Sequence, residues 1–251
     1  MEQLLYNIEL FFYDLKGQFI LNFIEKDRYK TMLTGLENTL KITIAAAIIG
    51  ILIGILLATI RSTYDKNYET LKRHKGLKYY LMSILNFIAQ TYLTIIRGTP
   101  VVVQLLIFFF IIFASSKNGV AIAMLTFGVN SGAYVAEIFR GGIMSIDNGQ
   151  FEAGYSLGFN YFQTMLYIII PQVLKNVLPM LLNEFIALLK ETSVAGYVAV
   201  TDITRAGNVI RGTTFSPFMP LIAVALFYLV MVLILTRVVR KVERRLRKSE
   251  R

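Results

Sequence analysis

The sequence predicts an all-α integral membrane protein with five membrane-spanning helices. Of its 251 residues, 55% are hydrophobic, and the mean hydropathy is +0.58. Residues 42–60 and 217–236 form uncharged runs, close to the ~20 apolar residues that a spanning helix needs. The positive residues behind the formal net charge of +10 are grouped beside such runs, which indicates membrane orientation rather than nucleic-acid binding.

Residues 1–35 are predicted to form an arm that precedes the spanning helices. Apolar side chains recur there at helical spacing, at Leu4, Ile8, Phe11, Phe12, Leu15 and Phe19. This spacing favours an amphipathic helix in the membrane interface, and a helix packed against the bundle fits it equally well. The arm lacks the basic start and the clean apolar core of a cleavable signal peptide.

Six apolar runs occur along the chain, but only five crossings agree with the charge distribution. The runs cover residues 42–60, 79–96, 101–116, 119–136, 165–190 and 217–236. The strongest basic excess lies in residues 61–78 and 237–251, and both segments therefore belong in the cytoplasm. Because an even number of crossings must connect them, we interpret the two runs that flank Pro100 as one bent element that crosses once.

The five predicted crossings place the two termini on opposite sides of the membrane. The N-terminus lies outside and the C-terminus inside, where residues 241–251 form a basic tail. Residues 140–163 then fall in the cytoplasm, between the third and fourth helices, and residues 197–215 fall outside. The cytoplasmic stretch GQFEAGYSLGFN, residues 149–160, predicts a short helix that either docks on another protein or simply turns the chain.

The stretch EAGYSLG (152–158) resembles the cytoplasmic motif of ABC importer permeases, in which an acid precedes small residues and a later glycine. The resemblance continues in RGTPVVVQL (97–105), AYVAEIFRGGI (133–143), IIPQVLKNVLP (169–179) and NEFIALLKETSV (183–194). Several spaced motifs in one order are more specific than a single match. Together they resemble the permease subunits of polar amino-acid importers over roughly residues 36–240. The sequence departs from the family at Gly154, where a second alanine is common, and in its longer N-terminal arm.

The resemblance implies a type I ABC importer permease fold, with residues 36–240 as the transmembrane domain in the bacterial inner or plasma membrane. It implies as partners ATPase subunits, a second permease subunit that is identical or paralogous, and an external substrate-binding protein that delivers an amino acid. The ATPase-coupling helix would contain Gln150, Glu152, Ala153, Gly154, Leu157 and Gly158. The chain has no GxxxxGK[ST] motif, so ATP and Mg²⁺ are expected on the partner ATPase, and neither a cofactor nor enzymatic activity is expected here. Capping of the helix dipole would explain Glu152 equally well.

Glu184 is the main candidate for solute binding. A carboxylate inside a spanning helix costs ~2.5–3.5 kcal/mol even on the mildest insertion scale, so it needs a partner. An amino acid supplies an ammonium group, and the predicted site comprises Glu184, Asn183, Thr192, Ser193, Tyr134 and Gln104. A structural ion pair of Glu184 or Glu191 with Lys190 or Arg97 is the alternative. Intramembrane carboxylates suit a cationic amino acid, but the α-ammonium of a neutral one satisfies Glu184 too, so both classes stay open.

Two charged positions and one glycine pair are better explained by structure than by solute binding. Glu137 precedes Arg140 by one helical turn, a spacing that predicts an ion pair. Arg97 is expected to reach the cytoplasmic interface or to pair with a buried acid. Gly50 and Gly54 form a GxxxG spacing that lets another helix approach closely.

Two other classes of protein fit the sequence less well. A secondary transporter driven by an ion gradient would use Glu184 as a proton carrier, but the cytoplasmic motif argues against it. A membrane-embedded enzyme lacks residues for its chemistry, because the chain has no cysteine, one histidine and no HExxH or GxSxG motif. No metal site is expected.

Overall fold

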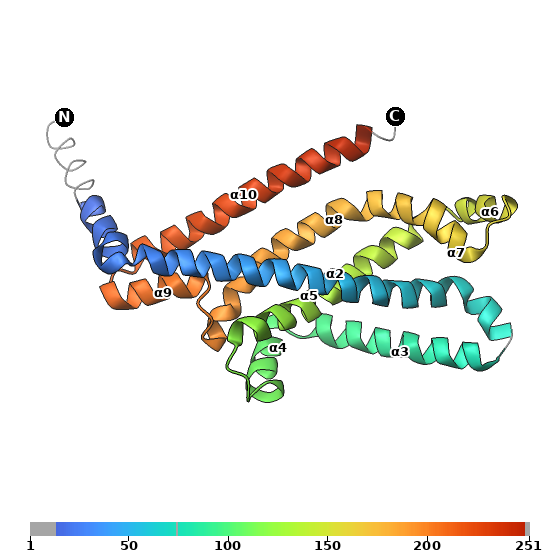
Figure 1. Ribbon diagram of the computed structural model, residues 1–251, viewed down its shortest axis with the longest axis horizontal. Coiled ribbons are helices and arrows are strands. Elements are labelled where there is room, and N and C mark those ends of the chain that lie inside the picture. Colours follow the sequence, from blue (N-terminus) through green and yellow to red (C-terminus); the bar gives the residue numbers. More distant parts are fainter. Residues whose placement is uncertain (1–13, 74, 249–251) are drawn as a thin grey trace.

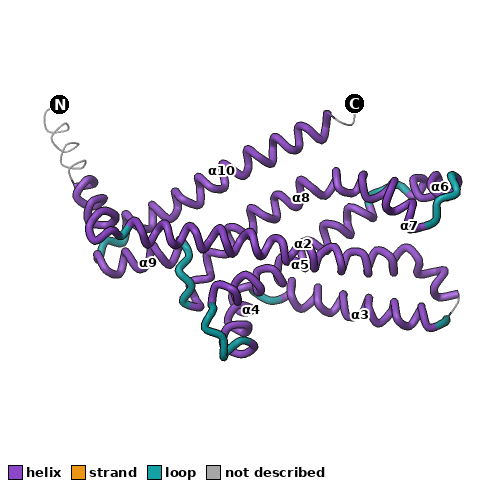
Figure 2. The backbone as a smooth tube through the Cα atoms, viewed as in Figure 1, coloured by secondary structure: helices purple, strands orange, loops and turns teal. Residues whose placement is uncertain are grey.

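The structure, a computed structural model, describes residues 14–73 and 75–248, and its regular elements there are all helical. Five helical stretches are long and apolar enough to cross a membrane, as predicted. They are Tyr29–Lys66, Leu77–Gly98, Gly119–Met144, Tyr161–Val198 and Phe218–Leu246. Figures 1 and 2 show them as an elongated bundle in which most helices follow the long axis. The α-helices are α2 (Tyr29–Arg73), α3 (Leu77–Gly98), α4 (Val101–Ile107), α5 (Gly119–Met144), α6 (Asn148–Ser156), α7 (Tyr161–Thr164), α8 (Ile170–Glu191), α9 (Ile203–Thr214) and α10 (Phe218–Lys248).

Five shorter stretches have other helical geometries. Three are π-helical, namely η1 (Ile20–Ile24), η3 (Phe108–Ile112) and η4 (Met165–Ile169). Two are 3₁₀-helical, namely η2 (Glu25–Asp27) and η5 (Thr192–Val198). Because η4 continues α7 into α8, and η5 continues α8, this part of the chain forms one extended helical stretch despite its changes of pitch.

The predicted bend at Pro100 is a complete break. Helix α3 ends at Gly98, Thr99 and Pro100 are extended, and α4 then begins at Val101. Proline cannot donate a backbone hydrogen bond, and it forces the residue before it away from helical geometry. Helix α3 alone is long enough to span a membrane, and residues 101–112 form a shorter apolar helix.

The two ends of the bundle carry different elements. Helices α6 and α7 and the α2–α3 connection lie at one end, and α10 runs towards that end from its start beside α9 (Figure 1). Helix α9 lies at the opposite end, close to the beginning of α2. This arrangement agrees with the predicted grouping of residues 61–78, residues 140–163 and the basic tail on one side. That this side is cytoplasmic stays a prediction.

Helices α2 and α5 form the central contact of the bundle and run in the same direction. A Cβ on Gly50 would lie 3.1 Å from the side chain of Ser131, and one on Gly128 would lie 2.7 Å from the side chain of Ile49. Gly54 and Gly132 make equivalent close approaches farther along the two helices. The predicted packing role of the GxxxG pair is therefore confirmed, and α5 contributes a second pair with the same spacing.

Buried side chains form several separate clusters along the bundle. One cluster joins α2, α4, α5, α8 and η5 around Phe127. A second joins α2, α5, α6, η4 and α8 around Phe139 and Phe151. Many apolar side chains of α3 and α10 instead point outward, including Phe87, Leu226 and Leu229, as expected for surfaces that meet lipid or another subunit.

The arm contacts the α9 end of the molecule. Asn22 of η1 is fully buried and donates to the Ser216 hydroxyl at 3.1 Å, while its carbonyl oxygen accepts from Thr214 at 2.7 Å. Of the predicted interfacial residues, Leu15 and Phe19 are exposed, and Leu4, Ile8, Phe11 and Phe12 lie outside the described residues. Helix α2 begins at Tyr29 and continues through residue 36, so the proposed domain boundary falls within a helix.

Candidate functional site

The predicted loop helix is α6, and its ends are fixed by side-chain and backbone geometry. The Asp147 carboxylate caps the helix by accepting from the backbone N–H of Gly149 at 2.7 Å. At the other end Gly158 has a φ of +82°, a conformation that favours glycine. Glu152 lies beyond the first turn. Capping therefore falls to Asp147, and the dipole interpretation of Glu152 is wrong.

One side of α6 is seated on the bundle. Phe151 is buried in a cluster with residues of α5 and α8, and the Lys66 ammonium of α2 lies 3.6 Å from the centre of its ring. Gly154 is buried against Thr164 of α7, whose Cγ2 lies 2.6 Å from the place a Cβ would occupy. The side chain of Thr164 thus fills the space that a Cβ at position 154 would need.

The opposite side of α6 is largely exposed in the described structure. Glu152, Ala153, Leu157 and Gly158 are exposed, and the Leu157 side chain keeps 72% of its surface accessible. Gln150 is exposed as well and accepts a hydrogen bond from Gln172 of α8 at 3.1 Å. A helix seated by one face and exposing an acid and a leucine on the other can receive a groove of a partner protein.

Glu184 meets α5 rather than a basic residue. Its Oε1 accepts a hydrogen bond from the Ser131 hydroxyl at 3.0 Å, and the residue is half-buried. The ion pairs found among the described residues include neither Glu184 nor Glu191. A hydroxyl uses one of the several lone pairs of a carboxylate and leaves the others free for a cation.

The other predicted solute-binding residues of α8 and η5 make separate contacts. Asn183 is exposed and donates to the backbone carbonyl of Pro179 at 3.0 Å. Thr192 is buried and donates to a backbone carbonyl of α8 at 2.7 Å. Ser193 lines a different cavity of about 290 Å³ together with residues of α9. Their roles in solute binding stay predictions.

Gln104 is buried at the break between α3 and α4. Its amide nitrogen donates to the carbonyl of Ile96 at 2.8 Å and to the hydroxyl of Thr99 at 2.8 Å. Its amide oxygen accepts from Asn130 of α5 at 3.0 Å. Broken helices at membrane depth require such replacement partners for their freed backbone groups. In this structure Gln104 holds the break, and its predicted contact with solute stays untested.

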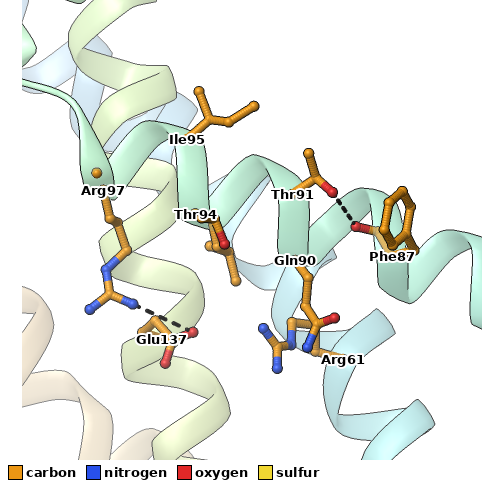
Figure 3. A pocket seen from close by; sticks show the side chains of 10 residues that line it. Arg61, Phe87, Gln90, Thr91, Thr94, Ile95, Arg97 and Glu137 are labelled. Carbon is orange, nitrogen blue, oxygen red and sulfur yellow. Dashed lines mark hydrogen bonds and ion pairs between the residues drawn. The ribbon is translucent and has the colours of Figure 1, made fainter.

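Tyr134 stands beside a polar cavity. The Arg97 guanidinium lies 5.8 Å from the centre of its ring, and Arg97 forms an ion pair with Glu137 at 3.7 Å. Glu137 also pairs with Arg140 at 3.5 Å, as its spacing predicts. Figure 3 shows Arg97 at the end of α3 reaching towards Glu137 on α5. The cavity, here called the α3–α5 cavity, measures about 620 Å³.

Several contacting residues have no signal in the sequence that assigns their role. Ser131 is a small hydroxyl residue within an apolar run and Thr164 directly precedes one, and only the rotation of the helices brings them to Glu184 and Gly154. Phe151 resembles any other apolar residue of the loop. The sequence predicts that Arg97 can pair with an acid, but that this acid is Glu137 depends on how α3 crosses α5.

The described residues provide no grouping suited to a metal ion, since three or more histidine, aspartate or glutamate side chains nowhere converge there. Carboxylates and imidazoles are the usual protein ligands of zinc and of the harder cations.

Comparison with known proteins places the chain in a family. Residues 50–248 match the family described as binding-protein-dependent transport system inner membrane component. The glutamine transport system permease protein GlnP of Escherichia coli (strain K12) is 38% identical over 169 residues, which cover 65% of this chain and 77% of that protein. The arginine transport system permease protein ArtQ of Bacillus subtilis (strain 168) is also 38% identical over 169 residues, covering 65% of this chain and 76% of that protein.

Solved structures share the fold. A crystal structure of an amino acid ABC transporter with histidines has 35% identity and a TM-score of 0.75, and the match covers 89% of this chain and 98% of that one. An inward-facing MetNI methionine ABC transporter has 16% identity and a TM-score of 0.69, over 86% of this chain and 96% of that one; it supports the fold alone. Because the family match covers residues 50–248, the chain belongs to the family of binding-protein-dependent transport system inner membrane components.

Proposed function

We propose that this chain is the permease subunit of an ATP-driven importer of a polar amino acid. Relatives named for glutamine and arginine transport support the solute class. The observation that carries the proposal is the geometry of α6. Phe151 and Gly154 seat the helix firmly on α5, η4 and α8, while Glu152 and Leu157 remain exposed. Such a helix can pass movement from an outside partner into the bundle.

The proposed complex contains three kinds of partner, each of which supplies a function that this chain does not perform alone. ATPase subunits would bind α6 and supply nucleotide hydrolysis with their own ATP and Mg²⁺, because the chain has no phosphate-binding GxxxxGK[ST] motif. An external binding protein would release the amino acid at the α9 end. A second permease subunit, identical or paralogous, would cover the exposed apolar faces. Alternate opening of the bundle moves the solute without chemical change.

Within the bundle, Glu184 is the proposed contact of the solute ammonium group. It is half-buried on α8 and bonded only to the Ser131 hydroxyl among the contacts described. A cation that reaches Glu184 would meet a carboxylate already oriented by that hydroxyl, without having to break an ion pair first.

The central experiment is uptake of radiolabelled glutamine and arginine by proteoliposomes that contain the permease, its ATPase and its binding protein. Uptake is expected to require ATP, and Glu184→Gln is expected to lower it by about tenfold or more, because a charge-assisted hydrogen bond is lost. Uptake driven by an ion gradient without the ATPase would contradict the proposal. Unchanged uptake by the variant would remove Glu184 from the site.

Coupling is tested by reversing one charge on α6. Glu152→Lys is expected to abolish solute-stimulated ATP hydrolysis or to release the ATPase from the complex, because the exposed acid faces the partner. Lys117→Glu, a charge reversal in the exposed segment between η3 and α5, is the matched control and should couple normally. Normal coupling in the Glu152 variant would show that α6 is only a connector.

A further inference from the structure

The α3–α5 cavity is polar where the surrounding bundle is apolar. Its lining includes the guanidinium groups of Arg61 and Arg97, the Glu137 carboxylate, and the neutral polar side chains of Gln90 and Thr94. Its volume of about 620 Å³ lies within the ~300–1,000 Å³ that is usual for small-molecule sites. Figure 3 shows Arg97 and Glu137 facing each other at one end, and Gln90 beside Arg61 at the other.

The ion pair at this cavity is loose. The Arg97 nitrogen lies 3.7 Å from the Oε1 of Glu137, which is longer than the ~2.7–2.9 Å of a charge-assisted hydrogen bond. The Arg97 side chain keeps 45% of its surface exposed, compared with 28% for Glu137. Arg97 also sits at the end of α3, one residue before the break, so its backbone anchors it less tightly than a mid-helix position would.

Glu137 is held more firmly than Arg97. Its second oxygen, Oε2, pairs with Arg140 at 3.5 Å, and Arg140 pairs in turn with Asp65 of α2 at 3.5 Å. Opposite charges therefore alternate from Asp65 through Arg140 and Glu137 to Arg97. Three of these groups lie on α2 and α5, the most closely packed pair of helices, so Arg97 of α3 is the member that is free to move.

We propose that the α3–α5 cavity is a binding site for a zwitterionic α-amino acid, whose carboxylate binds Arg97 and whose ammonium group binds Glu137. This inference rests on the proposed function, and it adds a second solute site to the one at Glu184. When a zwitterion enters, the loose Arg97–Glu137 pair is replaced by two closer pairs, one with each charge of the solute. Every charge then has a partner, as charges that are removed from water require. Arginine is suited to the carboxylate because its planar fork can donate two parallel hydrogen bonds.

The rest of the cavity selects the solute side chain. Two guanidinium groups and one carboxylate line the cavity, and this excess of positive charge opposes a cationic side chain. Gln90 and Thr94 provide both donors and acceptors. The site therefore fits a neutral polar side chain, such as the carboxamide of glutamine, better than the guanidinium of arginine.

The two solute sites lie along one helix. Ser131, the partner of Glu184, and Glu137 are both on α5, with Tyr134 midway between them. At ~1.5 Å of rise per residue the two positions are separated by roughly 9 Å along the helix axis. Glu137 is nearer the end of α5 that leads to α6. An amino acid moving towards α6 would meet Glu184 first and the Arg97–Glu137 pair second.

The test measures direct binding without the binding protein, so that only the membrane complex recognises the solute. Radiolabelled glutamine or arginine is titrated into the purified permease–ATPase complex carrying Glu184→Gln, which isolates the second site. Glutamine is expected to bind at least about tenfold more tightly than arginine. Adding Arg97→Gln is expected to weaken glutamine binding by about tenfold or more, and Arg97→Lys is expected to weaken it less, because the point charge remains without the fork.

Two further variants separate solute binding from a structural role. The double variant Arg97→Gln with Glu137→Gln removes both charges. If the pair has only a structural role, the double variant leaves no unpaired Glu137 carboxylate, and glutamine binding should recover. If the pair binds the solute, glutamine binding should stay weak. Lys78→Gln removes one positive charge at the exposed start of α3 and should bind as the parent does. Size-exclusion chromatography and thermal unfolding of each complex verify folding. Unchanged binding in Arg97→Gln, restored binding in the double variant, or equal affinity for arginine would overturn the inference. The proposed function is judged separately by ATP-dependent uptake in the unmodified complex.

Discussion

At the scale of single residues, Gly154 is the position with least room for change in the α6 region. A Cβ there would lie 2.6 Å from Cγ2 and 2.7 Å from Oγ1 of Thr164. Gly154→Ala is therefore expected to destabilise the protein by about 1–3 kcal/mol through overpacking, less up to ~1 kcal/mol gained from helix propensity. Thermal unfolding of the detergent-solubilised protein measures the change.

A second substitution tests the cause of this effect. Thr164→Ala removes both clashing atoms, together with a buried hydroxyl that has no hydrogen-bond partner among the described residues. Combined with Gly154→Ala it should restore the midpoint of unfolding. Gly141→Ala is the control, because no atom lies within 4 Å of its would-be Cβ. A double variant as unstable as the single one would show that the steric explanation is wrong.

At the scale of elements, the break between α3 and α4 depends on a side chain more than on a loop. Gln104→Leu keeps the volume but leaves the carbonyl of Ile96 and the amide of Asn130 without the partners they have now. Each group left unsatisfied is expected to cost about 1–3 kcal/mol. Chemical or thermal unfolding measures the loss. Gln90→Leu, on an exposed position of α3, is the matched control and should change stability little.

The same elements show how far the sequence leads. Five spans, a change of direction at Pro100, the loop helix and the glycine packing of α2 follow from hydropathy, charge and backbone chemistry, which act locally. The pairing of Arg97 with Glu137 and the bond from Ser131 to Glu184 depend on the rotation and crossing of helices. Helical spacing predicts which residues share a face, but it leaves open which face meets which neighbour. The predicted site combines residues of α8 and η5 with Tyr134 of α5 and Gln104 of α4, whereas the contacts of Glu184 and Arg97 across the bundle are made with α5.

At the scale of the whole molecule, the orientation in the membrane is the main prediction. The chain contains no cysteine, so single cysteines can be labelled without removing native ones. Ser156→Cys on α6 should react with a membrane-impermeant maleimide only after the cells are opened, and Gly212→Cys on α9 should react in intact cells. Both positions are exposed, so access depends on the side of the membrane. The reverse pattern would invert the topology and exclude α6 from contact with a cytoplasmic ATPase.

The glycine contacts between α2 and α5 also bear on how distant parts of the molecule move together. Neither helix can slide past the other, because side chains of one fill the gaps left by glycines of the other. Helix α2 contains 45 residues and so extends for roughly 68 Å, from the connection with α3 to the segment around Asn22. If α6 moves and displaces α5, α2 is expected to move with α5, because the two helices interlock. Movements of α6 during nucleotide binding and release would therefore reach the opposite end of the molecule, where the buried amide of Asn22 is hydrogen-bonded to Thr214 and Ser216.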